Sequence, residues 1–277
     1  GLHLFERDGD GGWKFVRLVS PFGPSSVAFL ERSDSLPSRS PSPRESGNAT
    51  GDDSAPTPTA TTTGESRFAT SHVAAVFMDT RREAVVSAWR LPSLELEPTP
   101  PLVATPLKAM TAVRGEAPRL VAGGRSGQLF WCDAALPGFV TTATLPAVRC
   151  LAASLDGQWV AVGGGAELEL WRIDPAGDGA ARRRGHAPFV RVGRLKRAAE
   201  QLVFSADARF LFVASDDKQE PAIHIIDCAT VSTARSIPTP GGGVSVLAIS
   251  PDGRWLASAG GERGVAVWDV TRLVGGL

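Results

Sequence analysis

The segment VSVLAISPDGRWLASAGGERGVAVWDV at residues 244–270 decides the fold. It holds three short apolar stretches, and the first two flank the turn Pro251-Asp252-Gly253. Aspartate suits this turn because its side chain bonds its own backbone two residues on, and glycine tolerates a positive φ. The third stretch follows a glycine turn and ends in Trp268 plus a polar residue. The segment therefore predicts three short strands joined by tight turns.

The same unit recurs upstream at residues 112–133, 148–174 and 202–227. The corresponding turns are Leu155-Asp156-Gly157 and Ala206-Asp207-Ala208. Measured along the third strand, Trp131 to Trp171 is 40 residues and Ile226 to Trp268 is 42. The interval between them is 55 residues, lengthened by an arginine-rich insertion. Periods of about 40–45 residues with several strands per unit are typical of propeller blades.

We therefore predict an all-β chain, a partial WD-repeat β-propeller with about four to six blades of four-stranded antiparallel sheet. Residues 1–32 are expected to form an N-terminal hairpin or strands of the propeller. Residues 33–66, rich in serine, proline and threonine, are expected to be a disordered insertion, because they bury too little apolar surface to offset ordering. Residues 67–277 are expected to be blades. Within them, the clear units are 107–135, 148–174, 199–229 and 243–273.

Six residues are expected to shape the blades. Trp131, Trp171 and Trp268 are large enough to wedge between neighbouring sheets, and Asp156, Asp207 and Asp252 occupy the repeated turns. The alternative reading of the tryptophans is an ordinary core position in another β-sandwich. The regular recurrence of the aspartate turn, in three successive units, favours the propeller.

Composition excludes several functional classes. The chain has 29 basic and 29 acidic residues, so no overall field attracts it to nucleic acid or membrane. Its three cysteines are widely spaced, which argues against a disulfide framework and against a zinc site. No apolar run approaches the roughly 18–20 residues that span a bilayer. Because the chain begins with Gly1, we expect a fragment of something longer.

We find no residues arranged for catalysis. No GxSxG motif supplies a serine nucleophile. The glycine runs at 163–165 and 241–243 lack the following lysine and helix that phosphate binding requires, so they are expected to be turn linkers. The chain is predicted to be no enzyme, with no cofactor, no metal and no small-molecule substrate.

The densest charge cluster lies in residues 182–197, which hold seven basic and no acidic residues. We interpret it as a candidate loop for binding RNA phosphates or an acidic protein partner. A nuclear localisation signal and a merely solvated loop between blades remain alternatives. Its basic residues are Arg182, Arg183, Arg184, Arg191, Arg194, Lys196 and Arg197.

Residues 148–273 resemble a known family. The phrases LVFSADARFLFVAS, IHIID and LAISPDGRWLASAGGERGVAVWDVTRL are similar to the C-terminal propeller of the cirhin family of WD-repeat proteins. This resemblance implies a non-catalytic scaffold of the small-subunit processome, acting in ribosome biogenesis and rRNA processing in the nucleolus of the nucleus. The implied partners are sister WD-repeat subunits and pre-rRNA, with no membrane. The alternative is a WD-repeat adaptor for protein–protein interaction in a cytoplasmic ubiquitin ligase, trafficking or ciliary complex.

Overall fold

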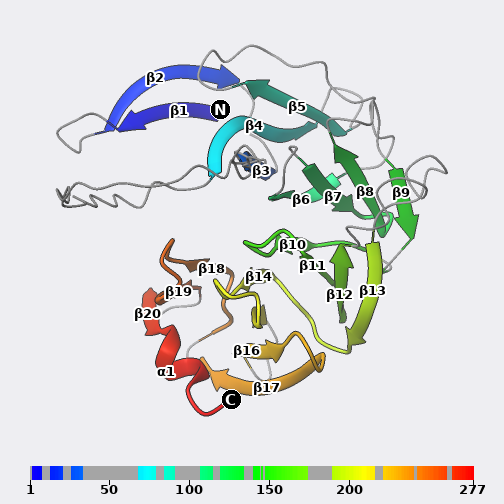
Figure 1. Cartoon of the computed structure of the whole chain (residues 1–277), viewed down its shortest axis with the longest axis vertical. Helices are drawn as coiled ribbons and strands as arrows, with labels where there is room; N and C mark the ends of the chain where they lie inside the picture. The colour runs from blue at the N-terminus through cyan, green and yellow to red at the C-terminus, as the bar shows by residue number, and fades with distance from the viewer. Residues whose placement is uncertain are drawn as a thin grey trace, which may run out of the picture.

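The described residues of the chain form six antiparallel β-sheets (Figure 1). The computed structural model describes residues 2–7, 13–20, 26–33, 68–78, 84–90, 107–114, 119–133, 140–143, 145, 147–173, 189–215, 221–239, 242–260 and 264–277. The first two sheets hold β1 (Leu2–Arg7) with β2 (Trp13–Ser20), and β3 (Ser26–Ser33), β4 (Phe68–Met78) with β5 (Ala84–Arg90). The predicted N-terminal hairpin corresponds to the pairing of β1 with β2.

The other four sheets follow in chain order. The third holds β6 (Leu107–Val113), β7 (Arg119–Gly124), β8 (Gln128–Asp133) and β9 (Val140–Ala143). The fourth holds β10 (Cys150–Ala153), β11 (Trp159–Gly164), β12 (Glu167–Ile173) and β13 (Phe189–Leu195). The fifth holds β14 (Gln201–Phe204), β15 (Phe210–Ser215), β16 (Ala222–Asp227) and β17 (Ser232–Pro238). The sixth holds β18 (Val246–Ile249), β19 (Trp255–Ala259) and β20 (Val265–Asp269), followed by the helix α1 (Val270–Val274).

The sheets lie side by side in an arc around a common centre (Figure 1). The first strands of successive sheets contact one another, in the order β3, β6, β10, β14, β18, and so form the inner wall. The last strands, β9, β13 and β17, lie on the outside of the arc. This arrangement is a partial β-propeller, as the repeat period predicted.

Burial on both faces of the strands holds neighbouring sheets together. In β11, Val160 and Val162 pack toward the preceding sheet, while Ala161 packs toward the following one. All three are fully buried. Each buried side chain of this kind contributes roughly 1.5–3 kcal/mol, less for alanine. The strands therefore read as nearly continuous apolar runs, since neither face meets water.

Strand register places the predicted tryptophans on both sides of one sheet-to-sheet contact. Trp131 lies opposite Val121, whereas Trp171 lies opposite Val160. Both rings join the cluster between the third and fourth sheets, Trp131 from one side and Trp171 from the other. The 40-residue spacing between Trp131 and Trp171 therefore does not connect equivalent positions of the third and fourth sheets. The turn between β7 and β8 has one residue more than the turn between β11 and β12, and this shifts Trp131 by one place.

The three predicted aspartate turns are built alike. Ser250 donates a hydrogen bond from Oγ to Oδ1 of Asp252 and accepts one from the backbone N–H of Trp255 at 3.0 Å. The backbone N–H of Arg254 also donates to Asp252 at 3.0 Å. The serine hydrogen bond is the first cause that holds the pKa of Asp252 below its ordinary value. Ser154 with Asp156, and Ser205 with Asp207, repeat the arrangement.

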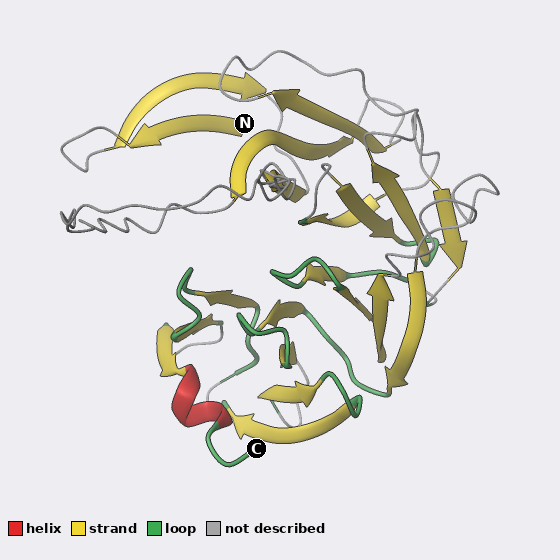
Figure 2. Cartoon of the chain, viewed as in Figure 1, coloured by secondary structure: helices red, strands yellow, loops and turns green. Residues whose placement is uncertain are grey.

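Three elements were not recognised in the sequence units. The outer strands β13 and β17 follow the units β10–β12 and β14–β16, and β17 is largely exposed and polar. The helix α1 begins at the cap Asp269, which accepts from the backbone N–H of Arg272 at 3.3 Å (Figure 2). In the part of the chain that the structure describes, no helix is long and apolar enough to cross a membrane. Residues 34–66, most of the predicted insertion, lie outside the described residues, while Ser33 ends β3.

The glycine run 163–165 contains positions with opposite tolerance for a side chain. A Cβ on Gly164 would lie 2.1 Å from the carbonyl oxygen of Ala147, whereas a Cβ on Gly165 would meet nothing within 4 Å. We predict that Gly164→Ala lowers the free energy of unfolding by about 2–3 kcal/mol, because backbone must move. The matched control Gly165→Ala stays within about 0.5 kcal/mol of the parent. Urea denaturation measures both, and equal effects would contradict the close approach.

Cys150 and Cys228 are buried free thiols in the cluster between the fourth and fifth sheets. Burial raises the pKa of each thiol to about 12. Because the thiolate is the reactive form, we predict that neither reacts with iodoacetamide at pH 8 until the protein unfolds. Mass spectrometry of a Cys132→Ala variant, which removes the third thiol, counts the labels. Labelling of the folded protein at the rate of free cysteine would contradict this core.

Candidate functional site

The predicted basic segment is only partly a loop. Arg182, Arg183 and Arg184 lie outside the described residues. Residues 189–195 instead form β13, the outer strand of the fourth sheet. The interpretation of residues 182–197 as a single loop is therefore corrected, because hydrogen bonding to β12 holds this half of the segment extended.

Pairing of β13 with β12 sets Arg194 opposite Glu169 and Arg191 opposite Trp171. A register shift between Leu170 and Trp171 adds one residue to β13, so that both arginines reach the same carboxylate. We call this group the arginine cluster. Its members are Glu167, Glu169, Trp171, Arg191 and Arg194.

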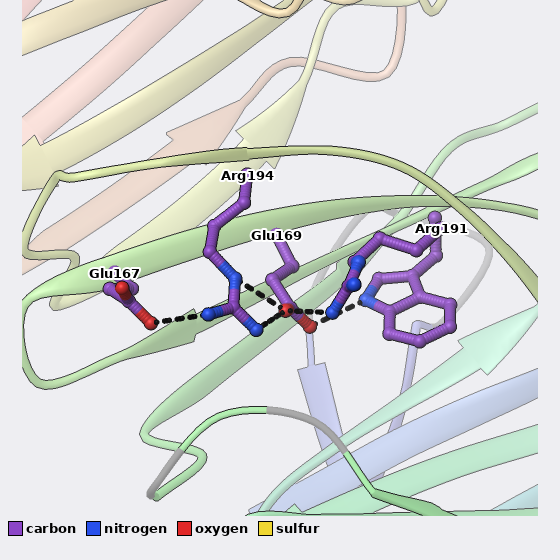
Figure 3. Close-up of polar contacts among 5 residues, drawn as sticks. Glu167, Glu169, Arg191 and Arg194 are labelled. Atoms are coloured by element: carbon purple, nitrogen blue, oxygen red, sulfur yellow. Dashed lines mark hydrogen bonds and ion pairs between the residues drawn. The ribbon is translucent and has the colours of Figure 1, made fainter.

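Glu169 is the centre of the arginine cluster (Figure 3). Its side chain is fully buried. Its Oε1 accepts hydrogen bonds from Nη1 of Arg191 at 3.0 Å and from Nε and Nη2 of Arg194 at 2.9 and 2.5 Å. Its Oε2 accepts from Nε1 of Trp171 at 3.0 Å. A buried carboxylate needs this many partners because an unpaired charge in the interior is costly.

Arg191 and Arg194 are half-exposed, and both form ion pairs with carboxylates of the same sheet. Nη1 of Arg194 also lies 3.2 Å from Oε2 of Glu167, so all three of its side-chain nitrogens face carboxylates. The hydrogen bond to Glu169 is the first cause that raises the pKa of Arg194. The Arg191 guanidinium stands 5.8 Å from the centre of the Trp171 ring, a cation–π distance. These two cations are therefore largely neutralised.

Aromatic packing anchors the beginning of β13. The Phe189 ring lies edge-on to Trp131 at 4.8 Å between centroids and to Trp171 at 6.3 Å. Such pairs prefer an edge-to-face arrangement because the ring edge is positive and the ring face negative. Phe189 thus ties the outer strand to the same contact between sheets that holds both tryptophans.

The other two predicted basic residues lie just beyond β13. Nη1 of Arg197 is 3.3 Å from Nε2 of the buried His224, whose Nδ1 is 2.8 Å from Oγ of Ser236. The structure therefore brings Arg191 and Arg194 together and places Lys196 and Arg197 just beyond the end of the same strand. Lys196 is exposed.

Glu169 was missed by sequence reasoning, although a signal is present. In the stretch Glu167–Ile173, side-chain alternation places Glu169 on the face of Trp171, opposite Leu168 and Leu170, in a strand buried on both faces. A charge at such a position requires a cation, and two arginines follow 22 and 25 residues later. No group of three metal-ligating side chains occurs among the described residues. A hollow of about 260 Å³ beside Pro238, Ser258 and Trp268 has no charged residue in its described lining.

A model of the family "WD domain, G-beta repeat" matches residues 232–269, which run from the start of β17 to the end of β20. Ser258 accepts a hydrogen bond from Nε1 of Trp268 at 2.9 Å within that match. Residues 232–269 thus match a WD repeat. This match agrees with the fold and with the resemblance noted in residues 148–273.

Two curated proteins align with 131 residues of the chain. The human protein named U3 small nucleolar RNA-associated protein 4 homolog is 31% identical over this length, and the mouse protein of the same name is 29% identical. Each alignment takes 46% of this chain and 18% of the relative. The chain thus spans about a fifth of the length of the curated relatives that it matches.

The arginine cluster yields a prediction about stability. The double change Arg191→Gln and Arg194→Gln leaves the Glu169 carboxylate buried with Trp171 as its remaining partner. We expect the free energy of unfolding to fall by about 3 kcal/mol, because a buried charge loses its counter-charges. Urea denaturation measures the loss.

Removing the carboxylate provides the control. Adding Glu169→Gln to the double variant is expected to restore more than half of the lost stability, because a neutral amide is cheaper to bury than an unpaired charge. If the triple variant is less stable than the double variant, burial of the charge is not the cause of the loss.

Proposed function

We propose that this WD-repeat chain belongs to a non-catalytic scaffold of the small-subunit processome, acting in ribosome biogenesis and pre-rRNA processing. The observation that carries the proposal is the alignment with two proteins named for association with U3 small nucleolar RNA. The partners on this proposal are sister WD-repeat subunits and pre-rRNA, and the location is the nucleolus. The competing proposal is a WD-repeat adaptor in a cytoplasmic complex.

The structure supports a scaffold through the form of its surface. Rigid sheets packed on both faces hold the turns and outer strands in fixed positions, and such surfaces suit protein binding. The turn residues Asp156, Asp207 and Asp252 are engaged in hydrogen bonds with their own serines, as structural elements are. Fold alone does not select a function, so the support for the first proposal over the second comes from the alignment with the relatives.

The basic segment divides into two roles on this proposal. Arg191 and Arg194 act inside the sheet, since Glu167 and Glu169 neutralise them. Lys196 is exposed and is the described residue of the segment best placed to meet a phosphate. Phosphate contacts of this type release counterions and make binding depend on salt.

Affinity purification tests the proposed function. The tagged protein is recovered from nucleolar and cytoplasmic extracts, and bound proteins and RNA are identified by mass spectrometry and sequencing. Recovery of processome subunits together with the 5′ region of pre-rRNA supports the proposal. Recovery of ligase, coat or ciliary proteins without pre-rRNA overturns it in favour of the cytoplasmic adaptor.

The division of the basic segment predicts different effects on RNA binding. Lys196→Gln is expected to reduce the slope of log affinity against log salt by about one, as loss of one phosphate contact does. Arg194→Gln, the matched control two residues earlier in β13, leaves this slope unchanged. Fluorescence anisotropy with a labelled single-stranded RNA measures both. Equal slopes for the parent and Lys196→Gln would remove Lys196 from the proposed contact.

A further inference from the structure

The fifth sheet carries a counterpart of the arginine cluster. In the fourth sheet, Glu169 on the third strand lies opposite Arg194 on the outer strand. In the fifth sheet, His224 on the third strand lies opposite Ser236 on the outer strand. In both sheets the register shifts one residue further along the third strand. His224 therefore occupies the position of Glu169, and both side chains are buried.

The two positions differ in charge. The Glu169 carboxylate forms ion pairs with the arginines of its cluster. His224 instead faces the guanidinium of Arg197, with 3.3 Å between Nη1 of Arg197 and Nε2 of the imidazole. The ion pairs of the described residues do not include Arg197. Arg197 thus keeps a positive charge for which the described part of the chain supplies no counter-charge.

The guanidinium assigns the hydrogen-bond donors around His224. Because a guanidinium can only donate, Nε2 of His224 accepts from Arg197. The ring proton then lies on Nδ1, which donates to Oγ of Ser236 at 2.8 Å. Ser236 is exposed, and since its oxygen accepts this bond, its own hydroxyl proton is available for another acceptor. The buried imidazole therefore holds a cation on one side and an exposed hydroxyl donor on the other.

We propose that Arg197 and Ser236 bind a backbone phosphate of RNA, and that His224 positions both. This inference rests on the proposed function and names the site at which the chain contacts the RNA. Phosphate oxygens accept from a guanidinium and from a hydroxyl, and the phosphate charge supplies what Glu169 supplies in the fourth sheet. Lys196 is exposed and precedes Arg197 directly in the chain, so it adds a second cation beside the same site.

The salt dependence of RNA binding by the purified chain tests the site. Fluorescence anisotropy with a labelled oligouridylate measures affinity at increasing concentrations of potassium chloride. Arg197→Gln is expected to reduce the slope of log affinity against log salt by about one, because a phosphate contact is lost. Ser236→Ala is expected to weaken binding about fivefold at an unchanged slope, because it removes a donor without a charge. The matched control Arg194→Gln, which removes an arginine paired with Glu169, keeps the slope of the parent.

Two substitutions of His224 separate its positioning role from simple packing. His224→Gln keeps a neutral acceptor and donor beside Arg197 and Ser236, so the slope of the parent is retained. His224→Glu recreates the carboxylate of the fourth sheet beside Arg197. The slope is then expected to fall as it does in Arg197→Gln, although no cation has been removed. Circular dichroism verifies that each variant folds.

The outcomes distinguish this site from the proposed function. A parent that does not bind the RNA, or an Arg197→Gln variant with the slope of the parent, overturns the site even if tagged protein recovers pre-rRNA. Arg197-dependent binding of a phosphoserine peptide, without a change in the RNA slope, overturns it in favour of a phosphoprotein partner. The expected slopes in the purified variants support the site even if recovery of cytoplasmic partners overturns the proposed function.

Discussion

The structure depends on the contact of each sheet with the sheet before it and the sheet after it. A strand such as β15 has all six residues buried, so its side chains belong to two interfaces at once. No single sheet could bury its apolar residues alone, and each becomes stable only through its neighbours. The close backbone approaches, such as that of Gly164 to Ala147, follow from the same crowding near the centre of the arc.

The features best predicted from the sequence were those fixed by local chemistry. Asp252 and Gly253 define their turn through one hydrogen-bond pattern and one positive φ, so the three-strand units could be read directly. The outer strand β17 was not recognised, because its exposed polar residues alternate with no apolar partner face. Its extended form comes from hydrogen bonds to β16, a tertiary effect that periodicity does not record.

The arginine cluster shows a different limit of sequence reasoning. A dense run of arginines without acidic residues suggested a binding surface. The carboxylate that pairs with both Arg191 and Arg194 lies more than twenty residues earlier, on β12. Only the pairing of β12 with β13 brings these charges together. A charge count over a local window therefore does not reveal that two of the four described basic residues face carboxylates, while Lys196 is exposed.

The WD-repeat match begins at β17 and ends at β20, out of phase with the sheets by one strand. Each unit of sequence thus contributes the outer edge of one sheet and the three inner strands of the next. Duplicating such a unit during evolution does not add a separate module. Each added unit shares a sheet with the unit before it. The array therefore lengthens without a boundary at which two units are held together by side-chain packing alone.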